Sequence, residues 1–109
     1  MNNEFELITF VVQRGKMDKV IKEVLKAGAA GATMFFARGT GVRERLKLMG
    51  ILIQPEKEVA FIITKKQDTE KLLEVIVKTA NLDKPGQGIV FVQPISKVVG
   101  YLEVNNENK

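Results

Sequence analysis

The sequence changes from strand-like to helix-like periodicity twice, and this feature constrains the fold more than any other. Residues 6–14 are rich in β-branched and aromatic side chains and are closed by Gly15, which predicts a strand. From Lys16 the apolar residues recur at helical spacing, and Gly28 is placed to end that helix. The apolar positions of this helix are Met17, Val20, Ile21, Val24 and Leu25.

The rest of the chain continues the alternation. Apolar runs at 32–38 and 59–64 predict two strands, a helical period returns over 69–80, and residues 89–93 predict a fourth strand after a glycine- and proline-containing loop at 83–88. The order β-α-β-β-α-β predicts an α+β, ferredoxin-like fold, in which two helices lie on one face of a four-stranded antiparallel sheet.

No linker or low-complexity segment interrupts this pattern. We therefore expect a single domain over residues 1–104 and a frayed tail over residues 105–109. Residues 98–102 are apolar enough for a short extra strand or for an interface.

Composition removes several classes of function. The chain has no cysteine and no histidine, and Ser96 is its only serine, which excludes disulfides, His or thiolate metal sites and Ser/His or Cys/His nucleophile pairs. We therefore expect a binding or regulatory module that is not an enzyme and holds no metal. The sequence shows neither a signal peptide nor an apolar run long enough for a membrane helix, so we expect a cytoplasmic protein that is not inserted in a membrane.

The net charge is only +4, but part of the excess is concentrated. Arg38, Arg43, Arg45 and Lys47 lie in one segment, where they could meet a phosphate or an acidic partner; the alternative is a solvated loop. The following residues 48–53 are apolar and suit partner docking, or else they extend a neighbouring strand.

Two loops contain closely spaced glycines. Gly39 and Gly41 follow the second predicted strand, and Gly86 and Gly88 precede the fourth. Glycine permits positive φ and close backbone approach, so successive N–H groups in such loops can bind an anion, although a plain tight turn is the alternative. Neither loop matches a Walker A or a dinucleotide-binding motif.

The predicted strands are too apolar for one sheet face to be left in water. With both helices on one face, we expect self-association to cover the other, in a closed cyclic oligomer with clefts between subunits. The alternative cover is the C-terminal segment.

Several motifs in this order resemble the PII-type signal-transduction family, the nitrogen regulatory PII proteins. The resemblance spans about residues 5–101 and rests on Gly31-Ala32-Thr33, Arg38-Gly39-Thr40-Gly41, Thr79-Ala80-Asn81, the run from Lys84-Pro85-Gly86-Gln87-Gly88 to Val92, and residues 94–99. It implies a homotrimer with adenine-nucleotide sites (ATP, ADP or AMP) between subunits. It also implies a T-loop at 42–53, which docks onto a membrane transporter or a metabolic enzyme, and a B-loop at 83–88.

The resemblance also implies the site residues. The nucleotide or anion would be bound by Thr33, Gly39, Thr40, Gly41, Ile62, Lys84, Gly86, Gln87 and Gly88, with Arg38, Arg43, Arg45 and Lys47 as loop cations for phosphate or partner. The family's phosphate-binding lysine and two arginines fall at Ile89, Gly100 and Leu102, so we expect another small anion or a nucleotide with fewer phosphates. Arg43 and Glu56 replace the residues that serve 2-oxoglutarate, and residues 42–53 offer no tyrosine or serine for modification.

Three alternatives remain open at this stage. The fold could serve only as a scaffold for protein docking. An RNA-binding module would need stacking aromatics on the central strands, and the chain offers Phe10 and Phe61. It lacks the K/R-G-F-G-F-V-x-F signature in the third strand and its charge excess is small, so we expect no nucleic acid partner. An acylphosphatase-like enzyme could use Arg14, Gly15 and Lys16, but its asparagine is not evident, since Asn81 is expected in the opposite loop region.

Overall fold

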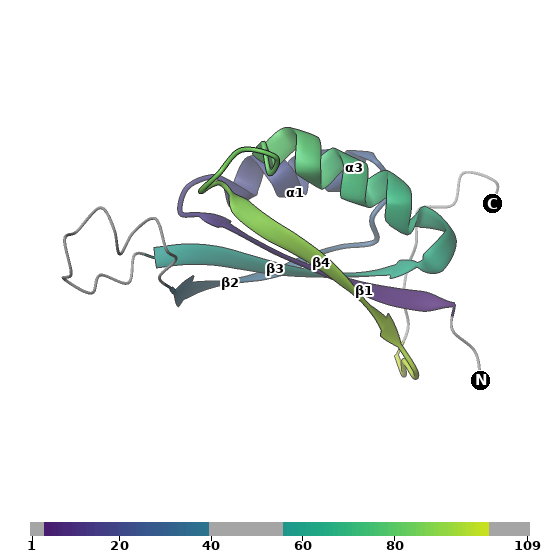
Figure 1. Cartoon of the computed structure of the whole chain (residues 1–109). Helices are drawn as coiled ribbons and strands as arrows, with labels where there is room; N and C mark the ends of the chain where they lie inside the picture. Colours follow the sequence, from purple (N-terminus) through teal and green to yellow (C-terminus); the bar gives the residue numbers. More distant parts are fainter. Residues whose placement is uncertain (1–3, 40–55, 101–109) are drawn as a thin grey trace, which may run out of the picture.

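The computed structural model describes residues 4–39 and 56–100, which form one sheet layer and one helix layer (Figure 1). The elements follow one another as β1 (Phe5–Gln13), α1 (Met17–Lys26), β2 (Thr33–Arg38), β3 (Glu56–Lys65), the short 3-10 helix η1 (Lys66–Asp68), α3 (Thr69–Ala80) and β4 (Gly88–Ile95). This order confirms the predicted ferredoxin-like arrangement.

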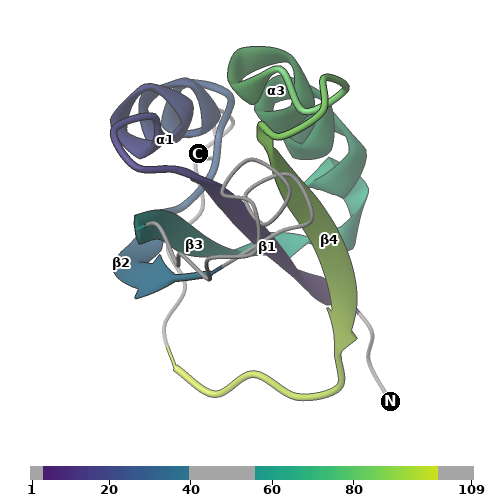
Figure 2. The ribbon, with the colours of Figure 1, turned by 60° about the vertical axis from the view of Figure 1, so that its left-hand side comes forward.

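The four strands form one antiparallel sheet in the order β2-β3-β1-β4. The central strands β1 and β3 pair along their length, from Phe5 opposite Lys65 to Gln13 opposite Lys57. Both α1 and α3 lie on the same face of this sheet (Figure 2). The other sheet face carries no helix of the described residues.

The core lies between the sheet and the helices. Alternate residues of β1 and β3 point toward the helix layer, because successive side chains of a strand point to opposite faces. The buried apolar side chains of the strands are Ile8, Phe10, Val12, Ala60 and Ile62, and those of the helices are Met17, Val20, Val24, Leu72, Ile76 and Ala80. Burial of this apolar surface is the main favourable term in folding.

Two strands extend beyond their predicted ends. β3 begins at Glu56 rather than at 59, and β4 continues through Pro94 to Ile95 rather than ending at 93. Proline lacks an N–H and is tolerated in a strand only where no ladder bond is needed, as on an edge. β4 is an edge strand that pairs only with β1, so Pro94 does not end it.

The C-terminal expectations are tested in part. Residues 98–100 form no strand, and the rest of the predicted extra strand, like the tail at 105–109, lies outside the described residues. The predicted boundary at residue 104 therefore stays a prediction. Neither α1 nor α3 is long and apolar enough to cross a membrane, nor is any other helix of the described ranges.

The sheet face opposite the helices is strongly apolar. Phe35, Phe61, Ile89 and Phe91 are between 38% and 56% exposed there, and the rings of Phe35 and Phe61 lie 5.5 Å apart. These four residues define what we call the open face. Along β3, Phe61 alternates with the buried Ala60 and Ile62, and along β4, Ile89 and Phe91 alternate with the half-buried Val90 and Val92.

Candidate functional site

The strand register gathers several predicted site residues at one end of the sheet. Arg38 lies opposite Glu56, Gln13 lies opposite Lys57, and Val12 lies opposite Gly88. The loops that follow β1 and β2 and the loop that precedes β4 therefore meet at this end, which we call the loop end.

The B-loop at 83–88 is held by a short series of hydrogen bonds. Asn81 ends α3 in the left-handed region (φ 55°), and its carbonyl accepts a bond of 3.0 Å from the Lys84 N–H. The Gln87 N–H donates to the Lys84 carbonyl at 3.4 Å. The Gln13 side-chain amide donates to the Gly86 carbonyl at 2.9 Å. The loop is thereby fixed to the end of β1.

The two B-loop glycines have the conformation that the sequence predicts. Gly86 and Gly88 have φ values of 82° and 143°. A Cβ on Gly88 would lie 2.2 Å from the Val11 carbonyl oxygen, so any side chain there would force the strand apart. Gly88 is therefore required both for its positive φ and for the close approach of β4 to β1.

The other glycine loop differs from the expectation. Gly39 does not have a positive φ, and a Cβ there would meet only the Lys57 side chain, at an ordinary distance of 3.9 Å. It directly follows the last residue of β2, Arg38. Gly39 therefore does not use the positive φ that glycine permits, and Gly41 lies outside the described residues.

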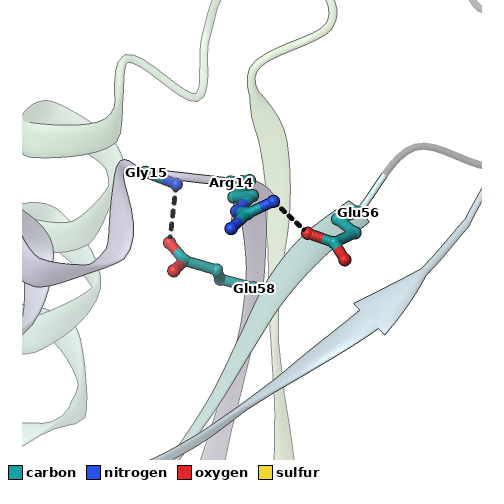
Figure 3. Close-up of polar contacts among 4 residues, drawn as sticks. All are labelled: Arg14, Gly15, Glu56 and Glu58. Carbon is teal, nitrogen blue, oxygen red and sulfur yellow. Dashed lines mark hydrogen bonds and ion pairs between the residues drawn. The ribbon is translucent and has the colours of Figure 1, made fainter.

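A buried carboxylate shapes the turn between β1 and α1. Glu58 is only 7% exposed, and its Oε1 accepts a hydrogen bond from the Gly15 N–H at 3.1 Å (Figure 3). The same oxygen accepts a second hydrogen bond, of 2.9 Å, from the Met17 N–H. It caps the N-terminus of α1, where Lys16 provides no side-chain cap. Sequence reasoning missed Glu58, although it falls in the same alternation as the buried Ala60 and Ile62.

Arg14 lies in the same turn and points across the loop end. Its guanidinium forms an ion pair with Glu56, the first residue of β3 (Figure 3), and lies 5.9 Å from the centre of the Phe36 ring. The Arg14 and Glu56 side chains are 66% and 45% exposed. This pair was not predicted, because its members are far apart in sequence.

The predicted nucleotide-binding residues form two groups within one subunit. Gly39, Gly86 and Gly88 lie at the loop end, together with the exposed Lys84 and the half-buried Gln87. Thr33 begins β2 at its other end, opposite Phe61, and Ile62 follows Phe61 with its side chain buried.

The predicted cations are described only in part. Arg38 is exposed at the end of β2, whereas Thr40, Arg43, Arg45 and Lys47 lie outside the described residues. Ile89, at the position of the family's lysine, is 56% exposed on the open face. Gly100 has a φ of 133°, and Leu102 lies outside the described residues.

The position of Asn81 corrects one expectation. Asn81 lies at the loop end, because α3 ends beside the B-loop, and not in an opposite loop region. Its left-handed backbone ends α3, while the Arg14 guanidinium points toward β3 and Phe36 on the other side of β1.

Comparison with known proteins supports the resemblance independently. The family model described as nitrogen regulatory protein P-II matches residues 5–101. The nifHD-region glnB-like protein 1 of Methanococcus maripaludis is 26% identical over 93 residues, which cover 84% of this chain and 89% of that protein. The nitrogen regulatory protein P-II homolog of Arabidopsis thaliana is 27% identical over 104 residues, which cover 90% of this chain but only 53% of that relative.

The fold has a match among solved structures as well. The crystal structure of Arabidopsis thaliana PII bound to citrate superposes with a TM-score of 0.73 at 24% identity, covering 99% of this chain and 94% of that one. This likeness concerns the fold, while the family model covers nearly the whole sequence. The chain therefore belongs to the nitrogen regulatory protein P-II family.

Proposed function

We propose that this protein is a cytoplasmic signalling regulator that binds a small anionic effector, an adenine nucleotide, in clefts between the subunits of a homotrimer. The segment at 42–53 then contacts a regulated protein, such as a membrane transporter or a metabolic enzyme. The observation that supports this most is the fixed B-loop, with Gly86 and Gly88 at positive φ, at the same sheet end as Gly39 and Arg38.

Backbone geometry and charge favour an anion at this end. Turns that contain positive-φ residues can present successive N–H groups to one anion. Lys84 is exposed within the B-loop, Arg14 follows the neighbouring strand β1, and Arg38 ends β2 at the opposite edge of the sheet. The related Arabidopsis protein was solved with citrate, an anion, which agrees with this preference.

The predicted nucleotide-binding residues lie in two separate groups, and this separation favours sites shared between subunits. Thr33 and Ile62 are separated along the sheet from Gly39 and Gly88. A cleft between two copies can bring such groups to one ligand. The open face supplies the apolar surface on which copies would pack.

The missing phosphate-binding cations favour an effector with few phosphates. Each charge-assisted hydrogen bond to a phosphate contributes about 1.5–3 kcal/mol. Apolar Ile89 and Gly100 provide none through their side chains. We expect the affinity for AMP or ADP to equal or nearly equal the affinity for ATP. Residues such as Arg43 and Arg45 would change this order if they supplied the missing charge.

A thermal-shift panel on the purified protein tests the proposal, after its oligomeric mass has been measured. The panel contains AMP, ADP, ATP, a cyclic nucleotide, 2-oxoglutarate, citrate and inorganic phosphate. A ligand at a hundredfold excess over its Kd adds about 2.7 kcal/mol of stability, so an effector should raise Tm by several degrees.

A matched pair of variants locates the binding. Lys84→Gln should reduce the rise in Tm, whereas Lys66→Gln removes the same charge from exposed η1, near the other end of β3, and should leave it unchanged. An intact trimer whose Tm no compound raises would contradict the effector proposal. It would favour the alternative, a scaffold that acts only through protein docking.

A further inference from the structure

The loop end contains a row of charged side chains, of which Arg14 has no role under the resemblance and Glu56 replaces a residue that serves 2-oxoglutarate. Arg14 follows the end of β1, Glu56 begins β3 and Arg38 ends β2. These three strands are consecutive in the sheet. We propose that Arg14 and Arg38 form an oxyanion-binding subsite, for a carboxylate or phosphate group of the effector, which the Glu56 carboxylate occupies until the effector displaces it. This inference rests on the proposed function.

The register sets the geometry of the row. Arg38 and Glu56 are direct partners across β2 and β3, so their side chains lie on the same sheet face. Arg14 contacts the same carboxylate from the opposite side. Because neighbouring strands lie about 4.8 Å apart, the two arginine backbones flank Glu56 at a separation of roughly 10 Å. That spacing suits one oxyanion between two long cationic side chains.

The backbone of Arg14 is fixed, although its side chain is exposed. Glu58 accepts hydrogen bonds from Gly15 and Met17, directly after Arg14, and Gln13 bonds to Gly86 directly before it. The Phe36 ring lies under the guanidinium at 5.9 Å. The guanidinium is therefore presented at one place while most of its donors still face solvent.

The Glu56 carboxylate, which the chain itself places against Arg14, is the observation that points to a ligand. Glu56 shows that the position accepts a carboxylate oxygen, and the side chains of its ion pair with Arg14 are 66% and 45% exposed. Such exposed pairs contribute little to stability, whereas an oxyanion can bond a guanidinium through two parallel N–H groups. An incoming carboxylate or phosphate can thus replace Glu56.

Displacement of Glu56 would couple binding to the rest of the molecule. Glu56 is the first residue of β3, and only Gln54 and Pro55 separate it from residues 42–53 in the chain. An effector at this subsite therefore acts on the residue through which the segment at 42–53 joins the sheet. The charge balance also changes, because two arginines lose their acidic neighbour and gain the effector's anion.

Isothermal titration calorimetry on the full chain tests the subsite, with ADP, citrate and inorganic phosphate as separate probes. The variants are Arg14→Gln, Arg38→Gln, Glu56→Gln and the double variant Arg14→Gln/Glu56→Gln, with Lys66→Gln as the charge-matched control at the other end of β3. For a probe that binds the wild type, we expect Arg14→Gln to weaken binding about tenfold or more and Arg38→Gln to weaken it as well. Glu56→Gln should tighten binding about threefold or more, since the competitor is gone.

The double variant separates this subsite from a general effect on stability. If Glu56 competes for Arg14, the gain from Glu56→Gln disappears when Arg14 is absent. The subsite is refuted if a probe binds the wild type but Arg14→Gln behaves like Lys66→Gln, or if Glu56→Gln fails to tighten binding. If none of the three probes, nor any compound of the thermal-shift panel, binds the wild-type trimer, the proposed function itself is refuted along with the subsite.

Discussion

Single residues at the loop end fix the backbone from which the site is built. Gly88 allows β4 to approach the Val11 carbonyl, and Glu58 holds the turn between β1 and α1. The positive φ of Gly86 and Gly88 could be predicted, because a glycine pair beside a proline is a local turn signal. Glu58 could not be predicted as a cap, since its partners lie 41 and 43 residues away in sequence.

Replacing Gly88 with alanine should destabilise the protein severely. The added Cβ would lie 2.2 Å from the Val11 carbonyl oxygen, and the φ of 143° is already unfavourable for a side chain. We expect Gly88→Ala to lower the free energy of unfolding by about 3 kcal/mol in urea denaturation. Gly31→Ala is the control, because that glycine has an ordinary φ and open space around it. Equal stability of the two variants would show that β4 does not approach β1 this closely.

Removing the Glu58 carboxylate should also be costly. Glu58→Ala leaves the Gly15 and Met17 N–H groups without their acceptor, and we expect a loss of about 2–4 kcal/mol in the free energy of unfolding. Glu58→Gln retains an acceptor oxygen and should lose about half as much. Glu56→Ala, which removes only an exposed ion pair, should change stability by less than about 1 kcal/mol. A Glu58→Ala variant as stable as Glu56→Ala would refute the capping role.

At the scale of whole elements, the helices were predicted more accurately than the strands. The helix over 69–80 has the predicted bounds, because its apolar spacing is regular over three turns. β3 was predicted too short, since Glu56, Lys57 and Glu58 are polar residues that the sheet nevertheless pairs. Strand ends depend on cross-strand partners, which local sequence does not reveal.

The end of α3 depends on one left-handed residue. Asn81 has a φ of 55° and a ψ of 45°, a conformation that asparagine tolerates and alanine does not. Asn81→Ala should lower the free energy of unfolding by about 1 kcal/mol, whereas Asn81→Gly should leave it equal or raise it. Thermal unfolding monitored by circular dichroism would measure both. If alanine is tolerated as well as glycine, the helix does not end in this conformation.

At the scale of the whole molecule, the open face is the apolar surface that the described residues of one copy leave uncovered. Its excess of apolar residues was predicted from the strand sequences, and Phe35, Phe61, Ile89 and Phe91 confirm it. The way in which the predicted nucleotide-binding residues come together could not be predicted from one chain, because Thr33 and Gly39 lie at opposite ends of β2. We therefore expect neighbouring copies to complete the site.

A charge on the open face should separate the copies without unfolding them. Phe61 is 38% exposed at the centre of that face, so Phe61→Glu should convert the proposed trimer to monomers while the far-ultraviolet circular dichroism remains that of the wild type. Leu25→Glu is the control, because Leu25 is 43% exposed on α1 and its substitution should leave the trimer intact. If Phe61→Glu remains a trimer, the copies associate through another surface.

The most direct test of the central claim is ADP binding measured by calorimetry on protein whose mass has been determined by light scattering. We expect a wild-type mass of three times the 12.2 kDa of one chain, with saturable ADP binding that is lost in monomeric, folded Phe61→Glu. A monomeric wild type, or undiminished binding by a monomeric Phe61→Glu variant, would contradict a nucleotide site shared between subunits.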